Sequence, residues 1–173
     1  MDLQLKIPEN IVVHLGSPGD ASAQNVTVPF VDYIKNVASS EIYPTWPDSS
    51  LRANILAQIT FVLNRIFTEH YRSQGYNFDI TNTEAYDQAF IPGRDYFENI
   101  SQIVDEIFNT YIVREGNINP IFPRFCNGTT SQCPGGMSQW GTVDLANQGY
   151  TPIEILRYYY GDDVVLVENV PVA

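Results

Sequence analysis

Apolar residues at helical spacing extend from Leu51 to Phe67 and place the strongest constraint on how this chain folds. The main face consists of Leu51, Ile55, Ile59, Val62 and Ile66, and Leu56, Leu63 and Phe67 widen it. A surface helix carries a narrower apolar stripe, so a face this broad is typical of a helix in the centre of a core. We therefore expect a long central helix that is capped by Asp48 or Ser49 and ends near Tyr71.

The segments around this helix predict further helices and a few short strands. Strands are expected at residues 11–15, 26–28 and 164–167. Helices are expected at residues 30–41, 93–114 and 142–147, and a capping box at Thr151–Glu154 opens a last helix that ends at Gly161. Residues 118–125 contain two prolines and form an edge strand at best. The predicted fold is α+β, a mainly helical single domain that covers residues 1–173.

The charge of the chain excludes several kinds of partner. Its formal net charge is -11 and its pI is near 4.3, and no run of Lys or Arg occurs. Nucleic acids and anionic membrane surfaces bind through such basic runs, so neither is an expected partner. No apolar stretch of about 18 residues is present to span a membrane. The first residues lack the apolar core of a signal peptide, so either the domain stays inside the cell or the chain is a fragment of a longer exported precursor. Because these residues look like the interior of a domain, the sequence favours a fragment.

Glu41 is the first residue to consider for chemistry. It follows a predicted amphipathic helix and precedes Tyr43 and Trp46, between which Pro44 bends the chain. An apolar setting destabilises a carboxylate and raises its pKa toward values useful to a general acid. On this pattern alone, a solvated surface glutamate beside a proline turn is the more common interpretation.

The glycine-rich segment from Gly135 to Gly141 offers a second group of polar side chains. Paired glycines allow backbone conformations that other residues avoid. Ser138, Gln139 and Trp140 supply a hydroxyl, an amide and a ring from one tight segment, which suits a sugar with an N-acetyl group. A structural turn with Trp140 as a core anchor explains the same pattern.

The two cysteines, Cys126 and Cys133, lie in a loop rich in Gly, Pro and Thr. A disulfide ranks first for them and free thiols rank second. A zinc site ranks third because it needs about four ligands, and His14 and His70 lie far away in the sequence. We expect neither a metal nor another cofactor.

Two blocks of the sequence resemble the SpoIID/LytB domain. Residues 28–47 resemble its opening block, in which a catalytic glutamate is followed by Trp-Pro and a long helix. Residues 136–141, 145–149 and 155–161 resemble its closing signature, so the blocks bracket nearly the whole chain in the correct order. Residues 32–43, 131–134 and 158–165 are most similar to the cortex-lytic enzymes of germinating spores. Many members of the family have a histidine where this chain has Cys133, so no role of that histidine carries over.

This resemblance implies a lytic transglycosylase that acts on the peptidoglycan strands of the spore cortex. Such an enzyme cleaves the bond between N-acetylmuramic acid and N-acetylglucosamine and leaves a 1,6-anhydromuramic end. Glu41 would serve as acid and then as base, and Ser138 and Gln139 would hold the sugar. Tyr43 and Trp46, with Trp140, would line the groove. The resemblance also implies an extracytoplasmic location in the cortex and coat region of the spore and a protease that activates the precursor.

Two other functions remain open from the sequence. A muramidase would release a reducing end with water and would need a second carboxylate opposite Glu41, for which Asp79, Asp87 and Asp95 are the candidates. A non-catalytic peptidoglycan-binding module would use Glu41 only as a structural residue.

Overall fold

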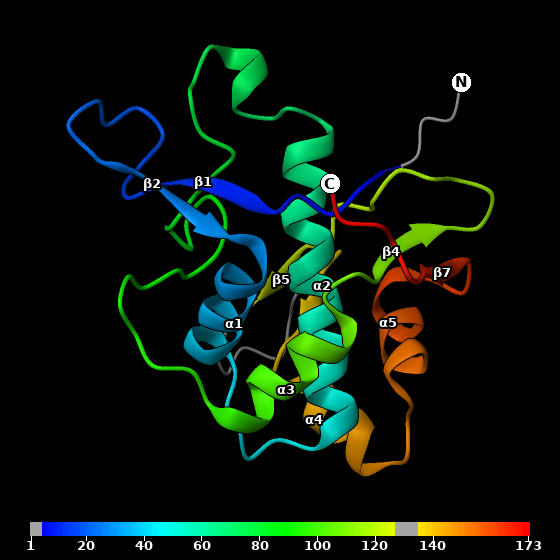
Figure 1. Ribbon diagram of the computed structural model, residues 1–173. Coiled ribbons are helices and arrows are strands. Elements are labelled where there is room, and N and C mark those ends of the chain that lie inside the picture. The colour runs from blue at the N-terminus through cyan, green and yellow to red at the C-terminus, as the bar shows by residue number, and fades with distance from the viewer. Residues whose placement is uncertain (1–4, 127–134) are drawn as a thin grey trace.

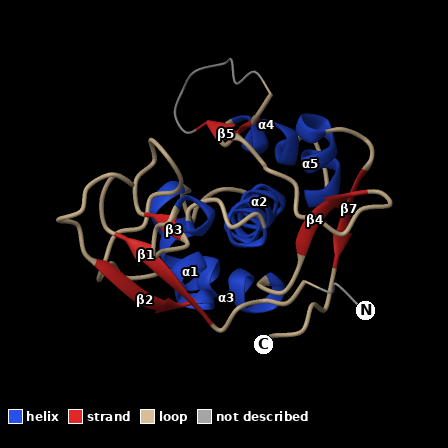
Figure 2. Ribbon diagram, turned by 90° about the horizontal axis from the view of Figure 1, so that it is seen from above, coloured by secondary structure: helices blue, strands red, loops and turns tan. Residues whose placement is uncertain are grey.

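The long helix α2 (Asp48–Phe67) is the centre of the protein, as the sequence predicts. The structure, a computed structural model, describes residues 5–126 and 135–173. Figure 2 looks along α2 and shows the other elements arranged around it. From Ser50 to Leu63 every residue of this helix except Arg52 is buried. The helix begins after Pro47 without a side-chain cap, so the predicted capping by Asp48 or Ser49 is wrong.

One side of α2 is covered by a small sheet and helix α1 (Phe30–Glu41) (Figure 1). Strand β1 (Asn10–His14) pairs antiparallel with β2 (Asn25–Pro29) and parallel with β3 (Ile80–Thr81). Pro29 ends β2 and directly precedes α1, so the position of the strand fixes where the helix begins beside the core. The strands at the start of the chain and helix α1 were predicted, whereas β3 was not.

The other side of α2 packs against the C-terminal part of the chain. Strand β4 (Tyr111–Arg114) pairs antiparallel with β7 (Val164–Val167), and α5 (Pro152–Tyr160) contacts both α2 and β7. The predicted capping box of α5 is present, since Thr151 and Glu154 exchange both hydrogen bonds. Helix α4 (Gly141–Asn147) precedes it and contacts α2 as well.

The remaining elements are short. Strand β5 (Phe125–Cys126) pairs parallel with β6 (Met137–Ser138), so only the end of the predicted 118–125 edge strand pairs. A turn of 3-10 helix (Arg72–Gln74) follows α2 after Glu69, whose φ of 51° ends the helical path. The expected end of α2 near Tyr71 was therefore a few residues too late.

The prediction of a helix at residues 93–114 is wrong at both ends. Helix α3 covers only Glu98–Ile107, and β4 follows it. Gly93 has a φ of 79° and Phe97 is extended, so the first residues cannot be helical. In β4 the pair Ile112 and Leu166 forms the centre of the ladder with β7, and this long-range pairing overrides the local helical pattern.

The described residues therefore have the predicted α+β class, with five α-helices and short strands. None of the helices in these two ranges combines the length and hydrophobicity that a membrane span requires.

Candidate functional site

Glu41 is the last residue of α1 and lies where the two sides of the protein meet. Its carboxylate accepts three hydrogen bonds from three other segments of the chain. The side-chain amides of Gln139 and Gln58 donate to Oε1, at 3.0 Å and 3.3 Å, and the backbone N–H of Ala89 donates to Oε2 at 2.9 Å. Residues far apart in the sequence thus converge on one half-buried carboxylate.

The surroundings of Glu41 change its acidity. Burial of the carboxyl raises the pKa of Glu41 from 4.5 to about 7. The hydrogen bonds from Ala89, Gln139 and Gln58 oppose this shift because they favour the charged form, while the charge of Glu84 adds to it. A carboxyl with a pKa near 7 is present in both protonation states around neutral pH, which is what a group that gives and then takes a proton needs.

The segment that carries Ala89 is fixed by buried side chains. Gln88 is fully buried; its amide donates to the carbonyl of Gln58, and its oxygen accepts from the hydroxyl of Tyr33. Three residues after Gln88, both backbone groups of Ile91 bond to the side chain of Asn36. These bonds hold the backbone N–H of Ala89 against the end of α1 and leave it little freedom to move.

The segment that carries Gln139 is fixed in the same way. Thr142 donates to the carbonyl of Gln139 at 2.6 Å and is itself bonded to Ser50 and Asn54 of α2. Gln139 is only 2% exposed, so its amide is shielded from solvent. The Ser138 hydroxyl accepts from the backbone N–H of Gly141 at 2.9 Å and closes the same turn.

Three aromatic rings form a cluster next to this carboxylate. Trp46 lies 5.7 Å from Tyr43 and 4.9 Å from Trp140 between ring centroids, and Tyr43 and Trp140 are 5.5 Å apart. Trp46 is 8% exposed and belongs to the core, whereas Tyr43 and Trp140 are 55% and 41% exposed. The cluster therefore exposes the rings of Tyr43 and Trp140 to solvent. Along the chain, Tyr43 is two residues from Glu41, and Trp140 directly follows Gln139.

The site residues predicted from the sequence differ in how they relate to Glu41. Gln139 contacts Glu41, and the three rings form one cluster beside them. Ser138 lies in the same turn, although its hydrogen bond goes to that turn. Cys133 lies outside the described residues, so its pairing with Cys126 stays a prediction.

Two contributors to the site were missed in the sequence. Gln58 carries a visible signal, because it and Asn54 are polar residues four apart on the face of an otherwise apolar helix. Ala89 contributes only its backbone N–H, for which a side-chain pattern gives no signal.

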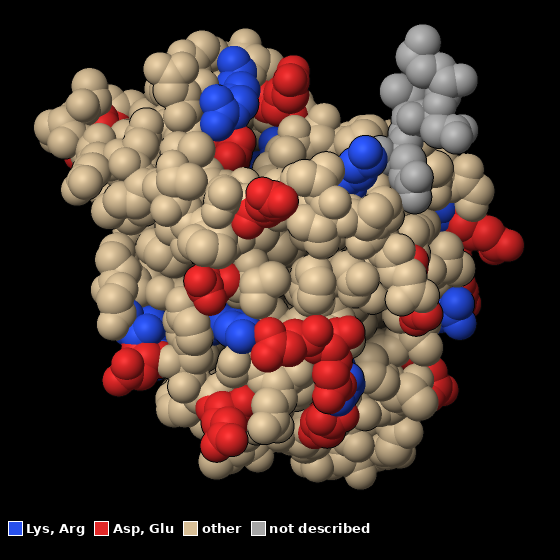
Figure 3. All heavy atoms as spheres, in the orientation of Figure 1, with Lys and Arg blue, Asp and Glu red and all other residues tan. Residues whose placement is uncertain are grey.

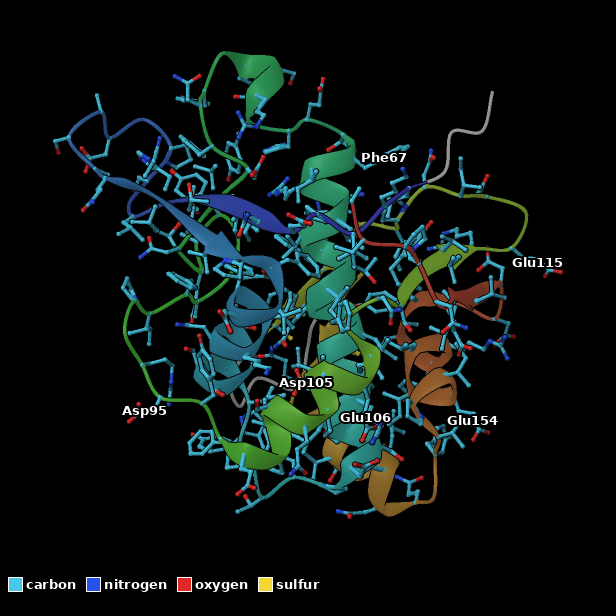
Figure 4. All side chains as sticks on the ribbon, in the orientation of Figure 1. Phe67, Asp95, Asp105, Glu106, Glu115 and Glu154 are labelled. Atoms are coloured by element: carbon cyan, nitrogen blue, oxygen red, sulfur yellow. The ribbon has the colours of Figure 1, made fainter. Side chains whose placement is uncertain are left out.

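The three aspartates that were candidates for a second catalytic carboxylate either bind other residues or lie in an exposed loop. Asp79 binds Arg72 and the backbone N–H of Val12. Asp87 is buried and accepts from four donors, on Arg65, Tyr71 and Thr81. Asp95 is exposed, and Figure 4 shows it at the outer edge of the loop that leads into α3.

Acidic side chains dominate part of the surface. Figure 3 shows them gathered over α3, where Figure 4 labels Asp105 and Glu106. The basic partners Lys35 and Arg52 are bound to these two carboxylates at 2.8 Å and 2.7 Å. Within the described ranges, no group of three His, Cys, Asp or Glu side chains is arranged to hold a metal ion.

One known family matches most of this chain. The family described as SpoIID, Stage II sporulation protein, matches residues 20–132, nearly two thirds of the 173 residues. The match includes Glu41, Tyr43 and Trp46 and ends before Gln139. No curated protein is similar enough to be matched. The family is associated with sporulation and cell-wall remodelling and is linked to peptidoglycan degradation. The chain belongs to the SpoIID family.

Proposed function

We propose that this protein is a lytic transglycosylase that cleaves the bond between N-acetylmuramic acid and N-acetylglucosamine in the peptidoglycan of the spore cortex. The observation that carries the proposal is the setting of Glu41, a half-buried carboxyl with a pKa of about 7 that is held by Gln139, Gln58 and Ala89. Membership of a family linked to peptidoglycan degradation supports the substrate class.

The chemistry needs only one carboxyl group. In its protonated form Glu41 gives its proton to the glycosidic oxygen while the bond from that oxygen to C1 of the muramic acid breaks. The resulting carboxylate then accepts the proton of the C6 hydroxyl of the same sugar, and the C6 oxygen bonds to C1. The attack is intramolecular, so correct positioning of the sugar supplies much of the rate. Glu41 ends the cycle protonated, as it began.

The residues around Glu41 suit this substrate. The exposed faces of Tyr43 and Trp140 offer a surface on which pyranose rings stack. Ser138 lies in the same turn as Gln139 and is half-buried, so we propose that it contacts the sugar as well. A glycan strand is the partner, and the cortex outside the cytoplasm is the place of action.

Mass spectrometry of the products tests the proposal. The protein is incubated with purified cortex peptidoglycan, and we expect fragments that end in 1,6-anhydromuramic acid. Loss of the general acid in Glu41→Gln should reduce their yield by about 100-fold or more, whereas the exposed control Asp95→Asn should retain it. Anhydro products formed by Glu41→Gln at the wild-type rate would rule out this role for Glu41.

A hydrolase is the second candidate, and it would need a second carboxylate near Glu41. The charge of Glu84 acts on Glu41 and raises its pKa, so another carboxylate lies within electrostatic range. A hydrolase would place water between two such groups and release reducing ends. Reducing ends from the wild type, lost in Glu84→Gln, would establish this alternative, while anhydro ends that persist in Glu84→Gln would exclude it.

A further inference from the structure

A pocket of about 530 Å³ lies away from Glu41, between the segment that follows β4 and the end of α5. None of the residues that hold Glu41 lines it. Its main lining side chains are Arg114, Asn117, Asn119, Phe122, Tyr159 and Tyr160. A volume of this size is typical of sites for small molecules.

The wall of this pocket is fixed by hydrogen bonds. Arg114 donates from Nη1 to the carbonyl of Tyr160 at 3.0 Å and to Asp163 at 2.7 Å. The hydroxyl of Tyr160 donates to the carbonyl of Arg124 at 2.6 Å. These bonds tie the end of α5 to the segments on both sides of it, so a ligand would have few groups to order when it binds.

Other polar groups of the pocket are available to a ligand. The side chains of Asn117 and Asn119 are exposed and hydrogen-bond to none of the residues that the structure describes. Next to these groups, Phe122 exposes 42% of its surface. The pocket thus combines ring surfaces with amides that can donate and accept.

The charge around the pocket favours a neutral ligand. Asp163 already pairs with Arg114, the cation of the lining, and Glu115 and Asp162 are exposed beside it. Figure 4 shows Glu115 pointing outward from the loop after β4. With a net charge of -11 over the whole chain, an anionic ligand would be repelled. Rings, amides and little free charge are the chemistry that recognises uncharged sugars.

The pocket is also connected to the proposed active site through one turn of the chain. A Cβ atom added to Gly141 would collide with the hydroxyl of Tyr159, so the end of α5 packs directly against this turn. The same turn carries Gln139, which donates to Glu41. Tyr159, which lines the pocket, therefore contacts the turn that also positions Gln139.

From these observations we propose that the pocket binds an N-acetylhexosamine unit of a glycan strand and is a second glycan-binding site of this protein. The choice of an N-acetylated sugar rests on the proposed function, while the preference for an uncharged saccharide rests on the lining. The amides of Asn117 and Asn119 bond to the acetamido and hydroxyl groups, and Phe122 packs against the sugar ring.

Nuclear magnetic resonance of the Glu41→Gln protein tests the proposal, because this variant leaves the added sugar intact. On titration with the tetramer of β-1,4-linked N-acetylglucosamine, the side-chain amide signals of Asn117 and Asn119 should shift and saturate. Replacing both asparagines with alanine should weaken the affinity of the pocket about three- to tenfold, as followed by the backbone amide signals of the pocket. The control Asn147→Ala, an exposed residue on α4, should leave it unchanged. Cellotetraose, which lacks the acetamido groups, should bind more weakly.

The signals separate the pocket from the active site. Shifts at the Gln139 amide without shifts at Asn117 and Asn119 would overturn the pocket and leave the proposed function standing. Shifts at the two asparagines without a shift at Gln139 would support the pocket and count against binding of the glycan at Glu41. Equal affinity for cellotetraose would overturn the assignment of an N-acetylated sugar.

Discussion

The side-chain amide of Gln139 donates to Glu41 at 3.0 Å, although 98 positions separate the two residues in the sequence. Gln139 belongs to the turn before α4, and Glu41 ends α1, so this contact joins the two sides of the protein across α2. The acidity of Glu41 therefore depends on the whole fold and not on its own helix alone.

The pH dependence of activity should depend on the hydrogen bond between Gln139 and Glu41. Because the proposed reaction starts from protonated Glu41, we expect kcat/KM to fall as the pH rises above about 7. Gln139→Leu removes a hydrogen bond that lowers the pKa, so this fall should move to higher pH. Carbon-13 titration of the Glu41 carboxyl gives the same shift without an activity assay. The control Gln148→Leu changes an exposed residue, and an identical pKa in Gln139→Leu and in wild type would contradict the role of the contact.

The raised pKa also has a consequence for stability. The folded protein binds a proton at Glu41 up to a pH of about 7, while the unfolded chain releases it near 4.5. Stability contributed by the neutral form is therefore complete below about 4.5 and is lost as the pH rises through about 7. Glu41→Gln keeps the site neutral, and the amides of Gln58 and Gln139 can rotate because their oxygens have no partner among the described residues.

We therefore expect Glu41→Gln to be more stable than wild type at pH 8, by about 2 kcal/mol. The difference should disappear toward pH 4.5. Urea denaturation at the two pH values measures it, with Glu168→Gln, an exposed glutamate, as the control. If the variant gains no stability at pH 8, Glu41 is an ordinary solvated carboxyl.

Much of the fold follows from local sequence patterns, and its main error shows where they fail. Helices α2 and α5 could be predicted because their signals are local. These signals are the apolar period from Leu51 to Phe67 and the capping box at Thr151–Glu154. The apolar residues after Ile107 fit either a helix or a buried strand. Only the pairing of Ile112 with Leu166, more than 50 residues later, decides for a strand.

The site is predictable to a similar extent. Glu41 and Gln139 lie in motifs that resemble a known family, and their contact is consistent with that resemblance. Gln58 could have been found as a polar residue that interrupts a buried face. Ala89 could not, because a backbone N–H becomes a ligand only through the path of the chain, which Gln88 and Asn36 fix.

The three rings beside Glu41 should separate into structural and binding roles. Trp46 is buried, so Trp46→Ala should destabilise the fold by about 3 kcal/mol or more. Trp140 is 41% exposed, and Trp140→Ala should weaken binding of a glycan oligomer about three- to tenfold with little loss of stability. Calorimetric titration and urea denaturation measure the two effects.

Phe67 provides a matched control for Trp140, because it is also 41% exposed. Figure 4 shows it at the opposite end of α2 from α3. Phe67→Ala should leave the affinity for the glycan unchanged. A loss of affinity as large in Phe67→Ala as in Trp140→Ala would mean that exposed rings in general, and not this cluster, determine binding.

Asp87 should prove to be a structural residue and not a second catalytic carboxylate. Its two oxygens accept from Arg65, from Tyr71 and twice from Thr81, and asparagine can replace only part of these bonds. Because Arg65 would also lose its buried partner, Asp87→Asn should lower the free energy of unfolding by about 3 kcal/mol or more. Below its unfolding temperature the variant should form the same products as wild type, as the exposed control Asp95→Asn should. A variant of Asp87 that keeps full stability and loses activity would instead place this carboxylate in the reaction, since a structural role predicts the opposite pattern.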